Sequence, residues 1–360
     1  MEEKILDEVV PMFEDIDADI AAGVVNHKVS DHVDVTVGSI INAILMGHKY
    51  RSKERRVEFF KIKKMIDDTF KAFGNPCMIL FQYKTHMFKN VPYLGTLYKS
   101  IASSRDVIMD YFKEKVAEKR ATVDFDNGAP AEDFVEAYLR KQKSLESEEG
   151  HTFDDEQLYG TMWDLWSAGQ ETTSNTVNWC IAYLINHPEI QEKLQTELSA
   201  ILSPDQLVTS DHRSRTPYVN AVVAETQRMA NILPTNVTHK TTKATVIHGY
   251  KIPAGQPIVS HISSMLYDER YFPEPHTFKP ERFIDENGAF KSHPALLPFG
   301  IGKRACLGEA LAKMELFLIV ANLFNRYKFV QNPENPASLK RVMSGTINAL
   351  PYKCRIEKRF

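Results

Sequence analysis

The chain has 360 residues, of which 43% are hydrophobic and 25% charged, values that are ordinary for a folded globular protein. Its 44 basic and 47 acidic residues give a net charge of −3, and the absence of a charged tail argues against a nucleic acid partner. No apolar run is long enough to span a bilayer, and the acidic N-terminus is unlike a signal peptide. Four well-separated cysteines without CxxC spacing indicate reduced thiols.

Helical periodicity dominates the first 150 residues. Apolar residues recur at three- and four-residue intervals, which predicts amphipathic helices over residues 1–20, 55–72, 103–120 and 131–145. The polar stretch Lys143–His151 then predicts a loop. An unusually long helical segment without proline follows over 154–186, and Pro188 suits the first turn of the next predicted helix, 188–202.

The pattern changes after a further predicted helix at about 216–231. The stretch Ala244–Ser263 alternates and contains Gly-Tyr-Lys-Ile-Pro-Ala-Gly, which predicts a hairpin whose turn torsion is supplied by Gly255. The stretch Tyr267–Leu297 predicts a loop, and a last helix is expected from Cys306 to about residue 325. We therefore predict one mainly α domain with small β-sheets.

The most informative segment is the loop Pro298-Phe-Gly-Ile-Gly-Lys-Arg-Ala-Cys-Leu-Gly-Glu309. Its marked positions are Phe299, Gly302, Arg304, Cys306 and Gly308. The spacing predicts a tight turn that presents one thiol at a helix N-terminus, where backbone N–H groups favour the thiolate. Small residues would let the backbone approach a flat ligand, and Arg304 could bind a carboxylate at its rim. Haem iron has such a thiolate in enzymes that split O2; the alternative is a buried structural cysteine.

Ala168-Gly-Gln-Glu-Thr-Thr173 lies midway along the long predicted helix. Threonine hydroxyls can bond back to helix carbonyls, and Gly169 removes bulk, so we expect a small groove with an acid and an alcohol side by side. Such a pair could bind a diatomic molecule and relay protons to it. The alternative is a helix that merely contains a few poor helix formers.

Glu225-Thr-Gln-Arg228 places opposite charges three residues apart on a predicted helix, where they face the same side. Arg282, in Phe278-Lys-Pro-Glu-Arg-Phe283, could contact the same carboxylate. Pairs of this kind are common on protein surfaces and contribute little there, so the spacing alone does not assign a role.

In combination, these segments resemble the cytochromes P450. Phe-x-x-Gly-x-Arg-x-Cys-x-Gly resembles the family's haem-binding loop, and the oxygen-activation segment, the Glu-x-x-Arg helix and the Gly249–Gly255 hairpin match in the family's order. The resemblance spans roughly residue 152 to the C-terminus. It implies a cytochrome P450 fold over 1–360, with the family's middle helices in 1–150 and its oxygen-activation helix, Glu-x-x-Arg helix and haem-thiolate loop in 151–360.

The resemblance also implies roles for single residues. It implies haem b with Cys306 as the axial iron ligand, Phe299, Arg304 and Gly308 in the cofactor loop, Glu171 and Thr172 in proton delivery and oxygen activation, and Glu225, Arg228 and Arg282 as a structural triad. His239 matches the position of a basic residue that meets a haem propionate, although a lone histidine there is more often a solvent-facing turn residue.

Two features of the family are missing from the sequence. There is no N-terminal membrane helix with a proline-rich hinge, and no Trp-x-x-x-Arg, because none of Trp163, Trp166 and Trp179 has an arginine four residues later. We therefore expect the N-terminal part of the fold to be missing. Unmatched backbone groups and apolar surface would then weaken folding and haem retention.

The implied activity is that of a haem-dependent monooxygenase that inserts one atom of O2 into a small lipophilic substrate. Electrons would come from a flavoprotein reductase, because the chain has no nucleotide-binding glycine motif. Lys303, Arg304 and Lys313 form a candidate docking patch, or an ordinary solvated face. The likeness is greatest to the animal drug-metabolising branch, which implies the cytosolic face of the endoplasmic reticulum, or the cytoplasm for a chain without an anchor.

The substrate is left open between a xenobiotic, a fatty acid and a sterol. By resemblance, its contacts are expected around Asp164–Ser167, Leu233–Val237 and Ser344–Ile347. Two other functions remain as alternatives. One is a truncated, non-catalytic remnant that acts as an interaction module, and the other is a haem-thiolate isomerase that uses peroxide substrates.

Overall fold

The computed structural model describes residues 1–75, 77, 89–125, 128–203 and 205–360. Its helices are α1 (Glu2–Ala21), α2 (Val29–Leu45), α3 (Lys53–Phe73), α5 (Leu94–Thr122), α6 (Phe134–Ser144), α7 (Asp155–Asn186), α8 (Pro188–Ser199), α9 (Pro217–Ala230), α10 (Ser263–Leu266) and α11 (Glu309–Arg326), with short 3-10 turns η1 (Ser210–Arg215), η2 (Pro280–Phe283) and η3 (Gly302–Arg304). The predicted mainly helical fold class is confirmed. Within this described part, no helix is both long and apolar enough to cross a bilayer.

The strands of the described residues form four two-stranded antiparallel sheets. They pair β1 (His239–Lys240) with β4 (Pro257–Ile258), β2 (Thr245–Ile247) with β3 (Tyr250–Ile252), β5 (Tyr327–Gln331) with β8 (Cys354–Lys358), and β6 (Arg341–Met343) with β7 (Ile347–Ala349). The sequence pattern predicted only the hairpin region among these. The C-terminal strands are only three to five residues long, so their alternation is too short to be distinguished from a loop.

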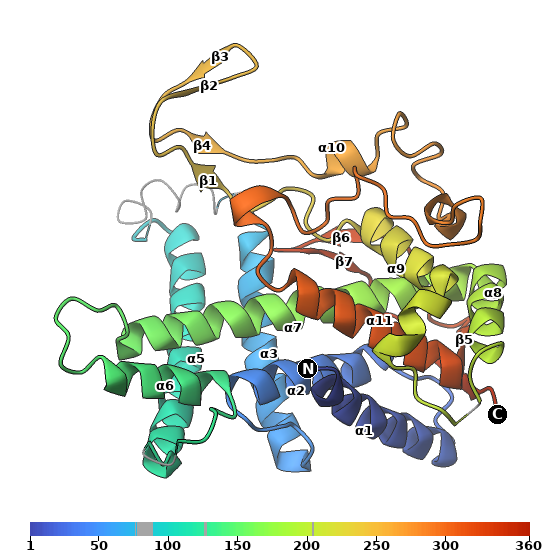
Figure 1. The fold of residues 1–360 in the computed structure, drawn as a ribbon, viewed down its shortest axis with the longest axis horizontal. Coiled ribbons are helices and arrows are strands. Elements are labelled where there is room, and N and C mark those ends of the chain that lie inside the picture. The colour runs from blue at the N-terminus through green and yellow to red at the C-terminus, as the bar shows by residue number, and fades with distance from the viewer. Residues whose placement is uncertain (76, 78–88, 126–127, 204) are drawn as a thin grey trace.

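Helix α7 crosses the middle of the molecule and carries two hydrophobic cores (Figure 1). Leu158, Met162 and Trp166, in its first half, pack in a core with α3, α5 and α6. The segment from Val177 to Ile185, in its second half, packs in a core with α1, α8, α9 and α11. Helix α2 lies along α7 and contributes to both cores. The middle of α7 therefore lies at the junction of the two cores.

Local sequence signals explain several helix starts. The Asp133 and Asp154 carboxylates accept hydrogen bonds from the backbone N–H groups three residues later, at 2.9 and 2.7 Å, and so cap α6 and α7. Pro188 and Pro217 occupy the first turns of α8 and α9, where a missing N–H costs nothing. Seven of the eight predicted helices begin and end within a few residues of the observed ones, but α5 begins at Leu94 and not near residue 103.

Helix α2 was not predicted. It is buried on nearly every side, so its sequence lacks the polar face that makes a surface helix recognisable. Its many β-branched residues also suit a strand as well as a helix. Only its packing between α1, α3 and α7 decides the conformation.

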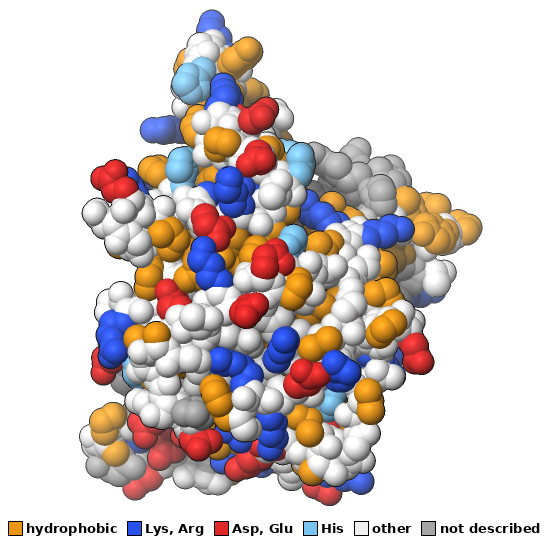
Figure 2. Space-filling model, turned by 90° about the vertical axis from the view of Figure 1, so that its right-hand side faces the viewer, with side chains coloured by type: hydrophobic (Ala, Val, Ile, Leu, Met, Phe, Trp, Pro, Cys, Tyr) orange, Lys and Arg blue, Asp and Glu red, His pale blue; other side chains and the backbone are white. Residues whose placement is uncertain are grey.

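The predicted hairpin forms, but its tight turn is not where the sequence placed it. Strands β2 and β3 are joined at His248 and Gly249, which both have positive φ, of 48° and 84°. This is the torsion pattern of a two-residue hairpin turn. Gly255 also has positive φ, 78°, but it forms the second turn, which leads into β4. The hairpin projects from the body, and the face seen in Figure 2 carries interspersed acidic and basic side chains.

A buried ionic cluster joins α9 to the loop that contains η2. Arg228 and Glu225 have no exposed surface, and two hydrogen bonds of 2.7 and 2.9 Å join the guanidinium to the carboxylate. Arg282 donates to the same carboxylate at 3.0 Å, as does the backbone N–H of Lys279 at 2.8 Å. Arg228 also donates to the carbonyls of residues 266 and 275. The three residues predicted as a structural triad are thus in contact.

The triad generates a prediction about folding stability. Substitution Glu225→Gln keeps the side-chain shape but removes the charge that balances two buried guanidinium groups. We expect it to lower the free energy of unfolding by about 3–5 kcal/mol, measured by urea denaturation. The control is Asp68→Asn, which breaks an exposed ion pair with Lys64 and should cost under about 1 kcal/mol. Equal effects of the two substitutions would contradict this account.

Candidate functional site

The Cys306 loop holds its thiol at the surface of the protein. The backbone N–H of Cys306 donates to the Phe299 carbonyl at 2.9 Å, which closes the loop around η3. Gly300 and Gly302 have φ values of 73° and 77°, a conformation that side chains disfavour, so the glycine spacing is required by the turn. The helix begins later than predicted, with Gly308 as N-cap of α11, so Cys306 precedes the helix instead of starting it.

The loop fits a planar apolar cofactor such as haem. Cys306 is exposed, and a Cβ atom built on Gly302 would meet nothing within 4 Å, so open space lies in front of the turn. Ile301 and Leu307, on either side, are 70% and 90% exposed, which is unusual for such large apolar side chains within one loop. A flat hydrophobic group against the thiol would cover them. Cys180 and Cys354, by contrast, are buried, and burial raises the pKa of each thiol to about 12.

The other predicted cofactor-loop residues lie on the same exposed stretch or on the β1–β4 sheet. Arg304 is exposed and has no hydrogen bond or ion pair to another described residue. His239, in β1, is half-buried, pairs with Ile258 through the backbone, and likewise has no side-chain partner in the described part of the chain. The Phe299 ring lies 5.7 Å from the Lys313 ammonium. Both cationic candidates are thus available to an anionic group.

The middle of α7 is polar although it is buried. Thr172 is half-buried, and its hydroxyl donates to the Ala168 carbonyl at 2.8 Å, a bond that leaves the oxygen able to accept another hydrogen bond. The expected groove at Gly169 is not present, because that position faces Ile41 of α2, whose Cδ1 atom would lie 2.6 Å from an added Cβ. The glycine serves close packing of α2 on α7.

The Glu171 side chain points into the protein and forms no hydrogen bond with Thr172. One carboxylate oxygen accepts from the Thr346 hydroxyl at 3.2 Å, and the other lies 3.6 Å from the Lys63 ammonium. Lys63 also contacts Asp34 at 3.6 Å and Asp67 at 2.9 Å. Burial raises the pKa of Glu171, and Lys63 opposes that shift. The acid therefore belongs to a buried charge network between α2, α3 and α7.

Glu315 is a functional candidate that the sequence did not reveal. It lies on α11 among the apolar residues Leu311, Met314 and Leu318, is 1% exposed, and accepts a hydrogen bond from Thr173 at 3.3 Å. Burial raises its pKa to about 8. The available sequence signal was that Glu315 follows Leu311 by four residues and so falls on the apolar face of the helix. The bond brings the middle of α7 against the helix that follows the Cys306 loop.

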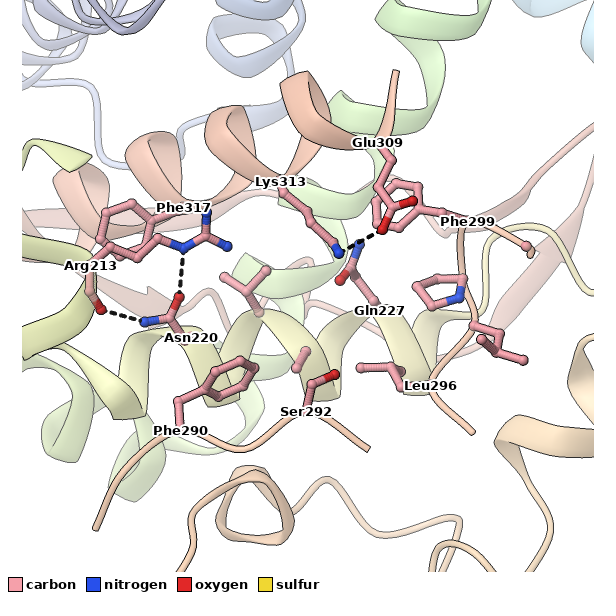
Figure 3. Close-up of a pocket in the computed structure, with 15 residues that line it drawn as sticks. Arg213, Asn220, Gln227, Phe290, Ser292, Leu296, Phe299, Glu309, Lys313 and Phe317 are labelled. Carbon is pink, nitrogen blue, oxygen red and sulfur yellow. Dashed lines mark hydrogen bonds and ion pairs between the residues drawn. The ribbon is translucent and has the colours of Figure 1, made fainter. Parts of the chain in front are cut away.

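A pocket of about 180 Å³ lies between α9, α11 and the segment before Cys306 (Figure 3). Lys313 of the predicted docking patch lines it and forms an ion pair with Glu309 at 2.6 Å. On the far side, Arg213 donates to Asn220 at 3.1 Å. The remaining lining is largely apolar and comes from α9 and the loop, with Leu296 and Phe290 among its members.

The segments expected to contact substrate are exposed to different degrees. Val237 is 79% exposed, whereas Trp166 and Thr346 have no exposed surface. The Ile347 carbonyl accepts hydrogen bonds from Asn175 and Trp179 at 2.9 and 3.0 Å, so its backbone serves the packing of β7 on α7. The pocket in Figure 3 is lined by none of these residues.

The buried acid of α11 predicts a pH dependence of stability. The pKa of Glu315 in the folded state, about 8, exceeds its ordinary value of 4.5. Between these pH values the folded chain keeps a proton that the unfolded chain has lost. The free energy of unfolding that this proton contributes is therefore complete below pH 4.5 and is lost as pH rises to about 8. The free energy of unfolding of Glu315→Gln, relative to that of the parent, should therefore rise by up to about 1.4 kcal/mol per pH unit between pH 5 and 8. Urea denaturation at unit pH intervals measures this, with Glu309→Gln as control; a constant difference would contradict it.

Comparison with known proteins gives one consistent result. The cytochrome P450 family model matches residues 1–354. Relatives include cytochrome P450 2B19 of Mus musculus, 33% identical over 83% of this chain and 60% of the relative, and cytochrome P450 2M1 of Oncorhynchus mykiss, 32% identical over 90% and 63%. Cytochrome P450 2J2 of Homo sapiens is 39% identical over 63% of this chain and 45% of the relative.

The chain therefore spans about three fifths of the length of the relatives that it matches over most of its own residues. The match covers the long helix α7, the buried Glu225 cluster and the Cys306 loop alike, and so agrees with the resemblance that the sequence motifs indicated. The chain belongs to the cytochrome P450 family.

Proposed function

We propose that this chain supplies the thiolate and oxygen-activation parts of a monooxygenase that hydroxylates a small lipophilic substrate with O2. The observation that carries the proposal is the exposed Cys306 thiol on a glycine turn, flanked by uncovered apolar side chains. Haem b bound there would activate O2, which is chemistry that no side chain can perform. The remaining argument concerns what the chain's own residues do.

The Cys306 thiolate would ligate the haem iron, and the loop would hold the sulfur in place. The hydrogen bond from its N–H to Phe299 fixes the turn, and the absence of side chains at Gly300 and Gly302 lets the backbone lie close to a flat ligand. Arg304 and His239 have no competing partners among the described residues, so they are available to bind propionate carboxylates at the cofactor's rim.

Thr172 is the residue that we propose holds the water molecule that would carry a proton to the oxygen-activation site. Its hydroxyl hydrogen is engaged with Ala168, but the oxygen retains acceptor capacity and the residue is only half-buried. Glu171 would act one step further back, as a proton reservoir in the Lys63 network, because burial raises its pKa. A water molecule would have to connect the two side chains, since no hydrogen bond joins them.

Electrons would come from a flavoprotein reductase that docks beside the thiolate loop. Lys303 and Arg304 are exposed and offer the positive charge for an acidic partner, while Lys313 is balanced by Glu309. By family likeness the substrate would be a small lipophilic compound such as a xenobiotic, fatty acid or sterol. By family likeness the site of action would be the cytosolic face of the endoplasmic reticulum.

A non-catalytic interaction module is the second candidate. It is favoured by the exposed Ile301 and Leu307 side chains beside Cys306, which a protein partner could bury. An isomerase that uses peroxide substrates needs no reductase, and no feature of the structure favours it over oxygen activation.

The first test is whether the full chain binds haem through Cys306. Reconstituted with haem, reduced and exposed to carbon monoxide, the chain should show a red-shifted Soret band in the difference spectrum, because thiolate ligation produces that shift. Cys306→Ser should abolish the band, and Cys77→Ser should retain it. A chain that binds no haem, or that gives the same band without Cys306, would leave the interaction module as the better account.

A second test separates oxygen activation from haem binding alone. With a reductase and lauric acid as probe, Thr172→Ala should lower the ratio of product formed to reductant consumed by about tenfold, because proton delivery would fail and peroxide would be released. Thr161→Ala is the matched control, since Thr161 makes the same back-bond, to Gln157 at 2.8 Å, nearer the N-terminus of α7. Unchanged coupling in Thr172→Ala would contradict the assigned role.

A further inference from the structure

A cluster of potential metal ligands lies far from the Cys306 loop, where α1 ends and α2 begins. It consists of Asp19, near the end of α1, His27, in the connection, and His32, in the first turn of α2. One ligand atom from each residue lies within 4.8 Å of the others. None of these residues has a part in the proposed oxygen chemistry.

His27 is a buried polar side chain without a hydrogen-bond partner. The residue is 2% exposed, and neither ring nitrogen is hydrogen-bonded to any residue that the structure describes. An unsatisfied buried polar group of this kind is costly, and it is rare in folded proteins. The Asp19 carboxylate and the Val24 carbonyl both lie near the ring. The neutral ring, with a free lone pair, is the form that binds metal ions.

The two distances from the Asp19 carboxylate lie on either side of the ligand spacing around a tetrahedral ion, and the shorter one is a hydrogen bond to His32 in the absence of an ion. Asp19 Oδ2 lies 3.1 Å from His32 Nε2 and 3.9 Å from His27 Nδ1. Ligands at about 2.0–2.2 Å from zinc are about 3.3–3.5 Å apart, a value that falls between the two distances. A hydrogen bond between Asp19 and His32 would explain the first distance alone. It would leave His27 buried beside a carboxylate at a distance too long for a hydrogen bond.

The ligand set decides which ion the site would take. Two imidazole nitrogens and one carboxylate oxygen suit Zn²⁺ and related transition ions, whereas Mg²⁺ and Ca²⁺ prefer oxygen ligands throughout. The Asp19 side chain is 42% exposed, so a water molecule can complete a fourth position from the solvent side. His27 and His32 are largely shielded, which fixes their rings.

We propose that Asp19, His27 and His32 form a zinc site that fastens the α1–α2 connection to the last strand of the chain. His27 exchanges two backbone hydrogen bonds with Cys354 of β8, at 2.8 and 3.0 Å. An ion on its ring would therefore join α1, α2 and β8, which are more than three hundred residues apart at their ends. A ligand that binds only the folded chain stabilises it in proportion to its affinity. The proposal is independent of haem binding.

Calorimetric titration of the metal-free full chain with ZnCl2 tests the proposal. We use a Cys306→Ser background, so that the exposed thiol cannot compete for zinc. One equivalent should bind, and Asp19→Asn and His32→Ala should each weaken binding at least about tenfold, since each removes one of three ligands. His27 is left unchanged because its replacement could disturb folding.

Two matched variants serve as controls. Asp31→Asn removes a neighbouring carboxylate that pairs with Lys28, and His151→Ala removes an exposed histidine elsewhere. Both should retain one tight equivalent, and zinc should raise the thermal unfolding midpoint of the controls but not of the two site variants. Equal zinc affinity in site and control variants, or binding without a defined stoichiometry, would overturn the proposal.

Discussion

The structure depends on a helix that must bury a polar middle. Helix α7 has apolar ends, each in its own core, and between them lie Gln170, Glu171, Thr173, Ser174, Asn175 and Thr176, all buried. Burying these groups without partners would cost several kcal/mol each. Ser174 and Thr176 bond back to carbonyls of α7 itself, whereas Glu171, Thr173 and Asn175 find partners on neighbouring elements, which helps to fix the relative positions of those elements.

The partners of this polar segment come from most of the chain. Lys63 of α3, Glu315 of α11 and the Thr346–Ile347 backbone and side chains all meet it, through ion pairs and hydrogen bonds of 2.9 to 3.6 Å. The contact with Glu315 has a functional consequence, because α11 begins just after the Cys306 loop. The hydrogen bond from Thr173 to Glu315 helps to hold α11 against the middle of α7.

The sequence predicted what depends on neighbours in the chain and missed what depends on distant ones. The Cys306 turn, the Glu225–Arg228 pair and the starts of α7 and α8 follow from residues a few positions apart. Gly169 was misinterpreted because its neighbour, Ile41, lies 128 residues earlier and only the fold brings them together. For the same reason, neither the Lys63 network nor the contact of Glu315 with Thr173 could be derived from spacing. The helical state of α2 depends likewise on its packing.

Unsatisfied polar atoms distinguish what this chain completes by itself from what it leaves open. The Glu225 carboxylate is deeply buried, yet three donor groups surround it, so this carboxylate is satisfied without a ligand. His27 is the one residue of the described chain with two buried side-chain atoms that lack hydrogen bonds, and two other potential metal ligands lie beside it. At Cys306 the deficiency is of a different kind, since apolar side chains are uncovered around an exposed thiol. A hydrophilic ion suits the first deficiency and a flat apolar cofactor suits the second, so the two sites call for chemically different ligands and can be occupied independently.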